Sequence, residues 1–106
     1  MLIFNTTFHV DEEVIDDFFT FIKNVYIPKS CESGVLERPR FAVIHSQHQE
    51  KGSNYSLQFH VENIDKLNQW LVKDGEIMQQ EIVDRFGQTV MGFITLMEEI
   101  DLGTNG

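Results

Sequence analysis

The sequence has few of the residues that mark several large classes of protein. Its 106 residues contain one cysteine, Cys31, so no disulfide can form within the chain and nothing requires an oxidising compartment. Basic residues are scarce: eight Lys and Arg stand against seventeen Asp and Glu, which gives a net charge of −9. An acidic protein repels phosphate groups, so we expect neither nucleic acid nor a membrane as a partner.

Long apolar runs are also missing. No stretch approaches the roughly 20 residues of a membrane span. The N-terminal stretch MLIFNTTFHVDEE does not resemble a signal peptide, because its apolar part is too short and it lacks basic residues. We therefore expect a cytoplasmic protein. The hydrophobic content of 42%, including nine Phe, is enough for a core. It predicts one domain over residues 1–100 and a flexible C-terminal tail over residues 101–106.

Four segments have strand patterns and two have helical periodicity. The strand patterns cover residues 2–10, 40–47, 54–62 and 89–100. Apolar residues recur at helical spacing over residues 12–26 and 64–86. This order predicts an α+β, ferredoxin-like βαββαβ domain, in which a four-stranded antiparallel sheet of order 4-1-3-2 carries both helices on one face.

Local signals set the expected ends of these elements. Asp11 and Asn63 have the side chains of helix N-caps, and Gly87 is typical of a helix end. We expect the first helix to break near Ile27–Pro28. A two-residue hairpin loop at Gly52–Ser53 would suit the second and third strands.

Two strands are apolar on both faces. Residues 41–44 are Phe-Ala-Val-Ile, and only Gly92 and Thr95 interrupt residues 90–97. The sheet face without helices would then be an exposed apolar patch, which soluble proteins rarely tolerate. Residues 101–106 are too few and too weakly apolar to cover it, so we expect a homodimer packed through this face.

Three stretches of the chain resemble a known family. They are NTTFHVDEEV (residues 5–14), YIPK (26–29) and RFGQTVMGFITLMEEI (85–100). The chain resembles, over nearly its full length, a family of small uncharacterised bacterial proteins, a domain of unknown function in the dimeric α/β-barrel superfamily. The resemblance implies the ferredoxin-like fold and a dimer. A His often precedes the Ile-Pro of that family, whereas Tyr26 stands there in this chain.

The wider superfamily implies several activities rather than one. It includes cofactor-free monooxygenases, haem-degrading enzymes, lactone isomerases and ligand-sensing domains, so the fold cannot name the function. Its haem-degrading members use an Asn on the first strand, a Trp and a helical His. Asn5 and Trp70 are present here, but the second helix has no His to serve as axial ligand, so we expect no haem and no other cofactor.

The predicted ligand site consists of polar residues on the sheet face that lacks helices. Alternation places side chains of the first and third strands on this face. In the 4-1-3-2 order we expect the first and third strands to be parallel neighbours, which places Asn5 near Ser56, Thr7 near Gln58, and His9 near His60. The candidate ligand-binding residues are Asn5, Thr7, His9, Ser56, Gln58 and His60.

The histidines allow more than one interpretation. With the two-residue hairpin loop, His45 faces His60, and these two could form a row with His9. Such a row could bind Zn²⁺, or iron if Glu62 joined it, or one His could act as an acid or base. The simpler interpretation is half-buried strand residues, and we expect no metal; His48 is expected in an exposed turn.

Two classes of function stay open. The first is a protein that binds a small organic ligand in the polar cleft, with a cofactor-independent monooxygenase or isomerase as its enzymatic form. The second is a non-catalytic dimeric module whose sheet face serves assembly. A cavity of several hundred Å³ would favour the first class, whereas a space filled by side chains would favour the second.

Overall fold

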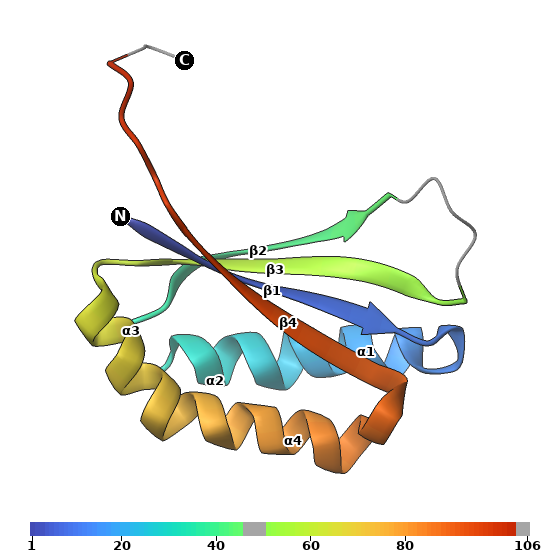
Figure 1. Ribbon diagram of the computed structural model, residues 1–106. Helices are drawn as coiled ribbons and strands as arrows, with labels where there is room; N and C mark the ends of the chain where they lie inside the picture. The colour runs from blue at the N-terminus through green and yellow to red at the C-terminus, as the bar shows by residue number, and fades with distance from the viewer. Residues whose placement is uncertain (46–50, 104–106) are drawn as a thin grey trace.

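The computed structural model describes residues 1–45 and 51–103. Its strands and helical segments follow the predicted order (Figure 1). The strands are β1 (Leu2–Val10), β2 (Glu37–Ile44), β3 (Ser53–Val61) and β4 (Val90–Glu98). The helices are α1 (Ile15–Phe21), α2 (Ile27–Cys31), α3 (Ile64–Trp70) and α4 (Glu76–Phe86), with 3₁₀ turns η1 (Glu12–Val14) and η4 (Gly87–Thr89) and π-helical turns η2 (Ile22–Tyr26) and η3 (Leu71–Gly75).

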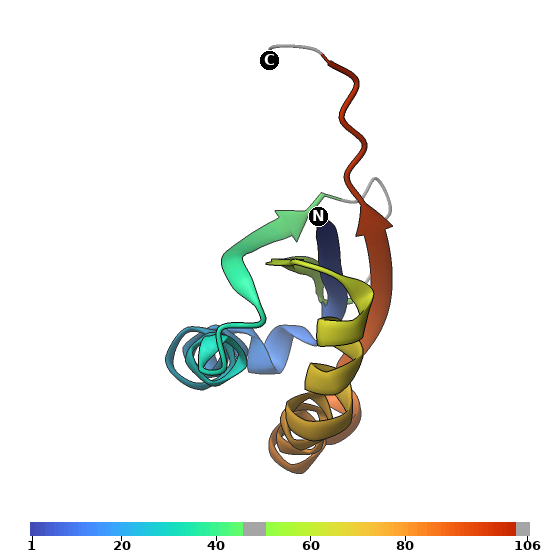
Figure 2. The ribbon, with the colours of Figure 1, turned by 90° about the vertical axis from the view of Figure 1, so that its left-hand side faces the viewer.

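The four strands form one antiparallel sheet in the order β2-β3-β1-β4. All helices lie on one face of this sheet, as the two ribbon views show (Figure 1, Figure 2). The other face carries none of the helices formed by residues 1–45 and 51–103, and we call it the open face. This arrangement confirms the predicted α+β, ferredoxin-like fold, including the strand order.

The prediction that strands 1 and 3 run parallel is wrong. Both β1 and β2 pair antiparallel with β3, because β3 lies between two strands that run the same way. On the open face Asn5 is therefore opposite Gln58, and Thr7 is opposite Ser56. The reversal changes which polar side chains meet across the sheet, although each strand keeps its predicted face.

The predicted two-residue hairpin loop is also wrong. β2 and β3 pair with Ile44 opposite Asn54 and Phe41 opposite Leu57. The connection therefore includes residues 45–52 rather than Gly52–Ser53 alone. Residues 46–50 belong to the part of the chain that is not described, and the prediction for His48 falls among them.

The first helical region runs past the predicted break. Its backbone stays helical from Ile15 through the π turn η2 and on to Cys31, with Pro28 in the first turn of α2. The π turn widens the helix just before the proline ring, where a regular turn would press the ring against a carbonyl. Asp11 precedes this region in an extended conformation, but its side chain makes no capping hydrogen bond.

The second helical region begins and ends as predicted. Oδ1 of Asn63 accepts a hydrogen bond of 2.9 Å from the backbone N–H of Lys66. Gly87 ends α4 with a positive φ of 56°, a conformation that costs glycine little. The π turn η3 lies between α3 and α4 and ends at Gly75. Both helical regions thus contain one π turn.

The core lies between the helices and one face of the sheet. Phe4, Phe8 and Val10 of β1 and Leu57, Phe59 and Val61 of β3 are buried there. Phe18 of α1 meets Phe8 edge to face, with ring centroids 5.2 Å apart. The outer strands β2 and β4 are much more exposed, which leaves apolar side chains at both edges of the sheet.

Candidate functional site

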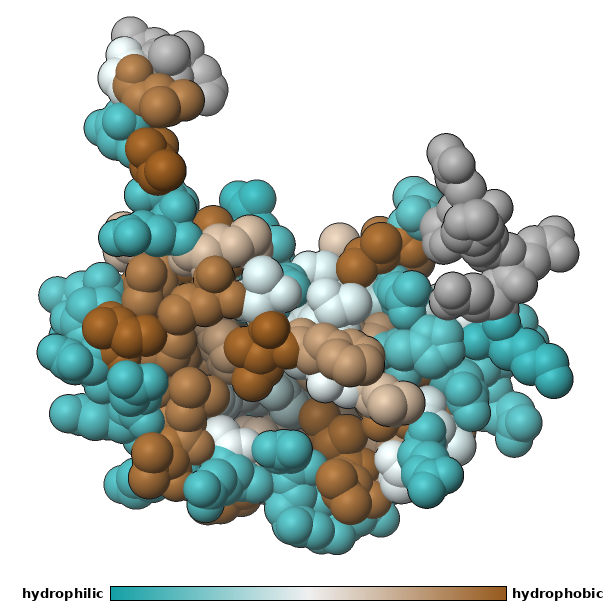
Figure 3. Space-filling view, viewed as in Figure 1, coloured by the Kyte–Doolittle hydropathy of each residue, from teal (hydrophilic) through white to brown (hydrophobic). Residues whose placement is uncertain are grey.

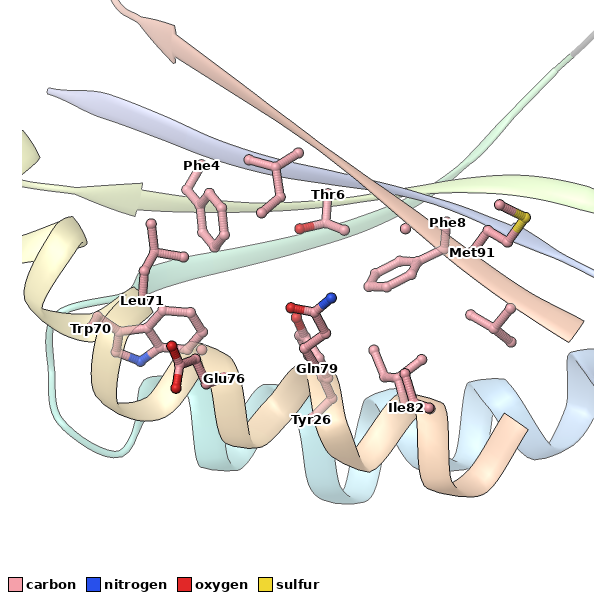
Figure 4. A pocket seen from close by; sticks show the side chains of 15 residues that line it. Phe4, Thr6, Phe8, Tyr26, Trp70, Leu71, Glu76, Gln79, Ile82 and Met91 are labelled. Atoms are coloured by element: carbon pink, nitrogen blue, oxygen red, sulfur yellow. The ribbon is translucent and has the colours of Figure 1, made fainter. Parts of the chain in front are cut away.

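A cavity of about 440 Å³ lies between the sheet and the second helical region. Its walls come from β1, β4, the end of η2 and the residues from Trp70 to Val83 (Figure 4). Most of the lining is apolar or aromatic, with Phe4, Phe8, Trp70, Leu71, Ile82 and Ile94 as its main members. This volume and this lining are typical of sites for small organic molecules.

Polar groups enter the cavity from both layers. Figure 4 shows Thr6 pointing from β1 towards the helices, and Gln79 and Tyr26 pointing from the helices towards the sheet. The side-chain hydrogen bonds found among the described residues include none from these three groups. A ligand with a hydroxyl, carbonyl or amide could therefore find hydrogen-bond partners there.

Tyr26 is buried, with 7% of its surface exposed. Burial raises the pKa of Tyr26 to about 12, because the phenolate would lose its solvation. The side chain is therefore a neutral phenol near neutral pH, and its O–H can donate a hydrogen bond. Glu76, at the start of α4, adds a carboxyl group to the lining.

The ring of Trp70 is held in place on one wall. Its Nε1 donates a hydrogen bond of 3.2 Å to the carbonyl oxygen of Ser30, and its ring meets Phe4 at a centroid distance of 5.9 Å. A Cβ added to Gly75 would lie 3.1 Å from Cζ3 of Trp70, so this glycine allows the close approach. These contacts set the position of the Trp70 ring in the wall.

Gly92 keeps the β4 side of the cavity unfilled. It stands opposite Phe8 in the sheet, and a Cβ there would lie 3.3 Å from Cε1 of Phe8 and 3.4 Å from Cγ2 of Thr6. A side chain at this position would occupy the space beside Phe8. Figure 3 shows apolar side chains gathered along β4 and along α4 on either side of a hollow.

The six predicted ligand residues all lie on the open face, away from this cavity. Asn5 donates to Oγ1 of Thr7 at 3.1 Å and accepts a hydrogen bond from the hydroxyl of Ser56. These three polar groups satisfy one another. Gln58 is half-buried opposite Asn5.

The structure separates the histidines instead of bringing them into one row. His9 is opposite Asn54 and hydrogen-bonds Oδ1 of that residue through Nδ1 at 2.7 Å. His60 is at the other end of β1, opposite Ile3, and its buried Nδ1 lies 3.6 Å from Oε1 of Glu99. His45 follows β2 and is exposed. The predicted proximity of His9, His45 and His60 is therefore wrong, because the strand direction and hairpin register are different.

Two further features concern metal binding and the cysteine thiol. Within residues 1–45 and 51–103, no three His, Cys, Asp or Glu side chains lie close enough together to hold a metal ion. Burial and the nearby Glu37 raise the pKa of the Cys31 thiol, which disfavours the thiolate.

In the described part of the chain, no helix is both long and apolar enough to cross a membrane.

The sequence profile of one family covers almost the whole chain. The match extends over residues 1–100 and is to the domain of unknown function DUF4286. The chain belongs to the DUF4286 family. The match over residues 1–100 confirms the predicted family resemblance. No curated protein matches the chain significantly.

Solved structures similar to this DUF4286 chain show the same fold. A protein from Bacillus halodurans described as an EthD family protein matches with a TM-score of 0.70 and 15% identity, covering 94% of this chain and all of that one. A Deinococcus radiodurans structure, described as a proposed antibiotic biosynthesis monooxygenase, matches with a TM-score of 0.61 and 16% identity over 95% and 94% of the two chains. The designed protein Foldit4 also matches, with a TM-score of 0.56 and 10% identity over 93% and 98%. At these identities the likeness shows the fold alone.

The cavity was not predicted from the sequence of this DUF4286 chain. Two signals could have indicated it. Gly92 interrupts an apolar strand, and such a glycine often marks a close approach or a bend. Tyr26 is a polar aromatic at the end of an apolar helix face, where its hydroxyl needs a partner.

Proposed function

We propose that this protein binds a small, mostly apolar organic molecule in the cavity between β4 and α4. The observation that carries the proposal is the cavity of about 440 Å³ whose apolar and aromatic walls include four polar side chains, Thr6, Tyr26, Glu76 and Gln79. Apolar walls supply binding energy, and a few polar groups orient the ligand. A ring compound with one hydroxyl or carbonyl suits this distribution.

The enzymatic form of this proposal is a cofactor-independent monooxygenase or isomerase acting in the same cavity. The two structural neighbours described as an EthD family protein and a proposed monooxygenase support it only by their fold. Binding and catalysis are separated by measuring turnover of a compound that binds.

The open face supports a second proposal, that two copies of the chain pack through it. Met91, Phe93 and Met97 of β4 and Ile44 of β2 expose apolar side chains there. Between two such faces, the six predicted residues Asn5, Thr7, His9, Ser56, Gln58 and His60 form a second candidate ligand site. The buried Nδ1 of His60, without a hydrogen-bond partner among the described residues, is the observation that favours it.

Titration calorimetry with 2-naphthol and with naphthalene tests the cavity. We expect 2-naphthol to bind more tightly, because its hydroxyl can pair with Tyr26 or Thr6. Gly92→Leu should abolish binding of both probes, while Val72→Leu on the helix surface should leave it unchanged. Tyr26→Phe should weaken 2-naphthol by roughly three- to tenfold and leave naphthalene unaffected. Unchanged binding to a folded Gly92→Leu variant would place any ligand elsewhere.

Light scattering tests the dimer. We expect twice the chain mass of 12.3 kDa at micromolar concentration. Phe93→Asp should give the monomer, whereas Ile77→Asp on α4 should not, although the two side chains are equally exposed, at 58% and 57%. A parent protein that is monomeric contradicts the proposal.

A further inference from the structure

The cavity between β4 and α4 is lined by charge of one sign. Among its lining residues within 1–45 and 51–103, only Glu76 has a side chain that is charged at neutral pH, and none is Lys, Arg or His. The buried polar groups, Thr6 and Tyr26, are neutral hydroxyls. The whole chain has a net charge of −9, so its field has the same sign as Glu76. A cationic ligand therefore finds an opposite charge in this cavity, whereas an anionic ligand does not.

Glu76 lies next to the indole ring of Trp70, as Figure 4 shows. Gly75 allows this proximity, because a Cβ there would lie 3.1 Å from Cζ3 of Trp70 and 3.3 Å from Cδ2 of Leu71. The backbone at the start of α4 can thus pass close to the ring and bring the next residue beside it. A cation that pairs with Glu76 can also contact the indole, and Trp is the aromatic side chain that attracts cations most strongly.

The carboxylate is at the mouth of the cavity, not in its interior. Glu76 is exposed, whereas Thr6 and Tyr26 are buried. Moving an ammonium group fully out of water would cost much of its hydration energy, but at the mouth it keeps part of its water. Glu76 takes part in none of the ion pairs found within the described ranges. Its charge is therefore available to a ligand.

The start of α4 does not supply a compensating site for an anion. A free helix N-terminus attracts anions through its unpaired N–H groups. Here the backbone is already helical through the π turn η3, and the N–H of Glu76 donates to the carbonyl oxygen of Leu71. Gly75 also has right-handed helical angles. A ligand at the mouth thus meets the negative charge of Glu76 without the positive end of a helix beside it.

We infer that the ligand of this cavity is a cationic amine, a molecule with an apolar ring and one ammonium group. The ring occupies the apolar interior, and the ammonium group lies at the mouth between Glu76 and the indole of Trp70. This inference rests on the proposed function and names the class of ligand for the same cavity. Its test therefore compares molecules that share one ring and differ in charge.

Titration calorimetry with three naphthalene derivatives tests the sign of the charge. The 2-naphthylmethylammonium cation should bind roughly three- to thirtyfold more tightly than its neutral isostere 2-naphthylmethanol, because it adds an ion pair and a cation–π contact. The anion 2-naphthoate should bind more weakly than the alcohol. If neither the alcohol nor the cation binds, the proposed cavity function fails. If the alcohol binds at least as tightly as the cation, only the inferred ligand class is overturned.

Two isosteric variants of α4 separate Glu76 from the general charge of the protein. Glu76→Gln should weaken the ammonium probe by roughly three- to tenfold and leave 2-naphthylmethanol within about twofold. The matched control is Asp84→Asn, which removes one exposed carboxylate from the same helix outside the cavity lining and should change neither probe. Circular dichroism checks that both variants are folded. Equal weakening by the two variants would mean that the net charge, not Glu76, attracts the cation.

The indole N–H of Trp70 reports where the cation binds. Trp70 is the only tryptophan of the chain, so a proton–nitrogen correlation spectrum contains one indole signal. We expect the ammonium probe to shift this signal with the same dissociation constant that calorimetry gives. Saturable binding that leaves the indole signal unmoved would place the cation elsewhere and overturn the inference.

Discussion

The hydroxyl of Ser56 on β3 donates a hydrogen bond to Oδ1 of Asn5 on β1, although the two residues are diagonal rather than opposite in the ladder. The amide of Asn5 in turn donates to Thr7. One buried asparagine thus satisfies two hydroxyl groups on the open face. The polar groups that suggested a ligand site from the sequence are, at this point, occupied with one another.

Asn5→Leu should destabilise the fold, because it removes the partner of both hydroxyl groups. We expect a loss of about 1–3 kcal/mol in the free energy of unfolding, measured by urea denaturation. Gln58→Leu is the matched control, since Gln58 is directly opposite Asn5 but makes none of the side-chain hydrogen bonds found in the described part of the chain. Equal stability of the two variants would argue against a structural role for the Asn5 network.

Gly52→Ala should cost more stability than Gly34→Ala. Both glycines have a positive φ, of 91° and 80°, so both alanine variants are strained. A Cβ on Gly52 would also lie 2.3 Å from the carbonyl oxygen of Val10, whereas one on Gly34 would meet no atom within 4 Å. We expect a loss of about 1 kcal/mol for Gly34→Ala and at least about twice that for Gly52→Ala. Thermal unfolding followed by circular dichroism would show the order.

The buried Tyr26 should make stability fall at alkaline pH. Its pKa is about 12 in the folded protein and 10.0 as the ordinary value, so between these values the folded state holds a proton that the unfolded state releases. The contribution is complete below pH 10 and is lost as the pH rises towards 12, up to a limit of about 3 kcal/mol. Denaturation at pH 9 and pH 11 should show a smaller loss for Tyr26→Phe than for the parent.

The Cys31 thiol should react slowly with a disulfide reagent such as DTNB. Burial and the charge of Glu37 both raise its pKa, so less thiolate is present at pH 8 than in an ordinary cysteine. The pH at half-maximal rate should move down in Glu37→Gln, because that variant removes the negative charge. A reaction faster than that of free cysteine at pH 8 would mean that the thiol is activated.

Local patterns in the sequence determined most of the secondary structure and the fold class. The period-two alternation of residues 2–10 and 54–62 assigned the correct side chains to each sheet face, because a strand turns successive side chains to opposite sides. Asn63 and Gly87 marked the ends of the second helical region, since capping depends on the hydrogen bonds and backbone angles of a few adjacent residues. The family resemblance over residues 1–100 was readable from the sequence in the same way.

Only the tertiary structure decided which residues meet. The direction of β1 against β3 and the register of β2 against β3 separated His9, His45 and His60, because a change in either moves every cross-strand pair while each strand keeps its own pattern. The π turn before Pro28 also lies outside the usual helix signals. The cavity beside Gly92 depends on the space that packed elements leave between them, and no single segment of the chain encodes that space.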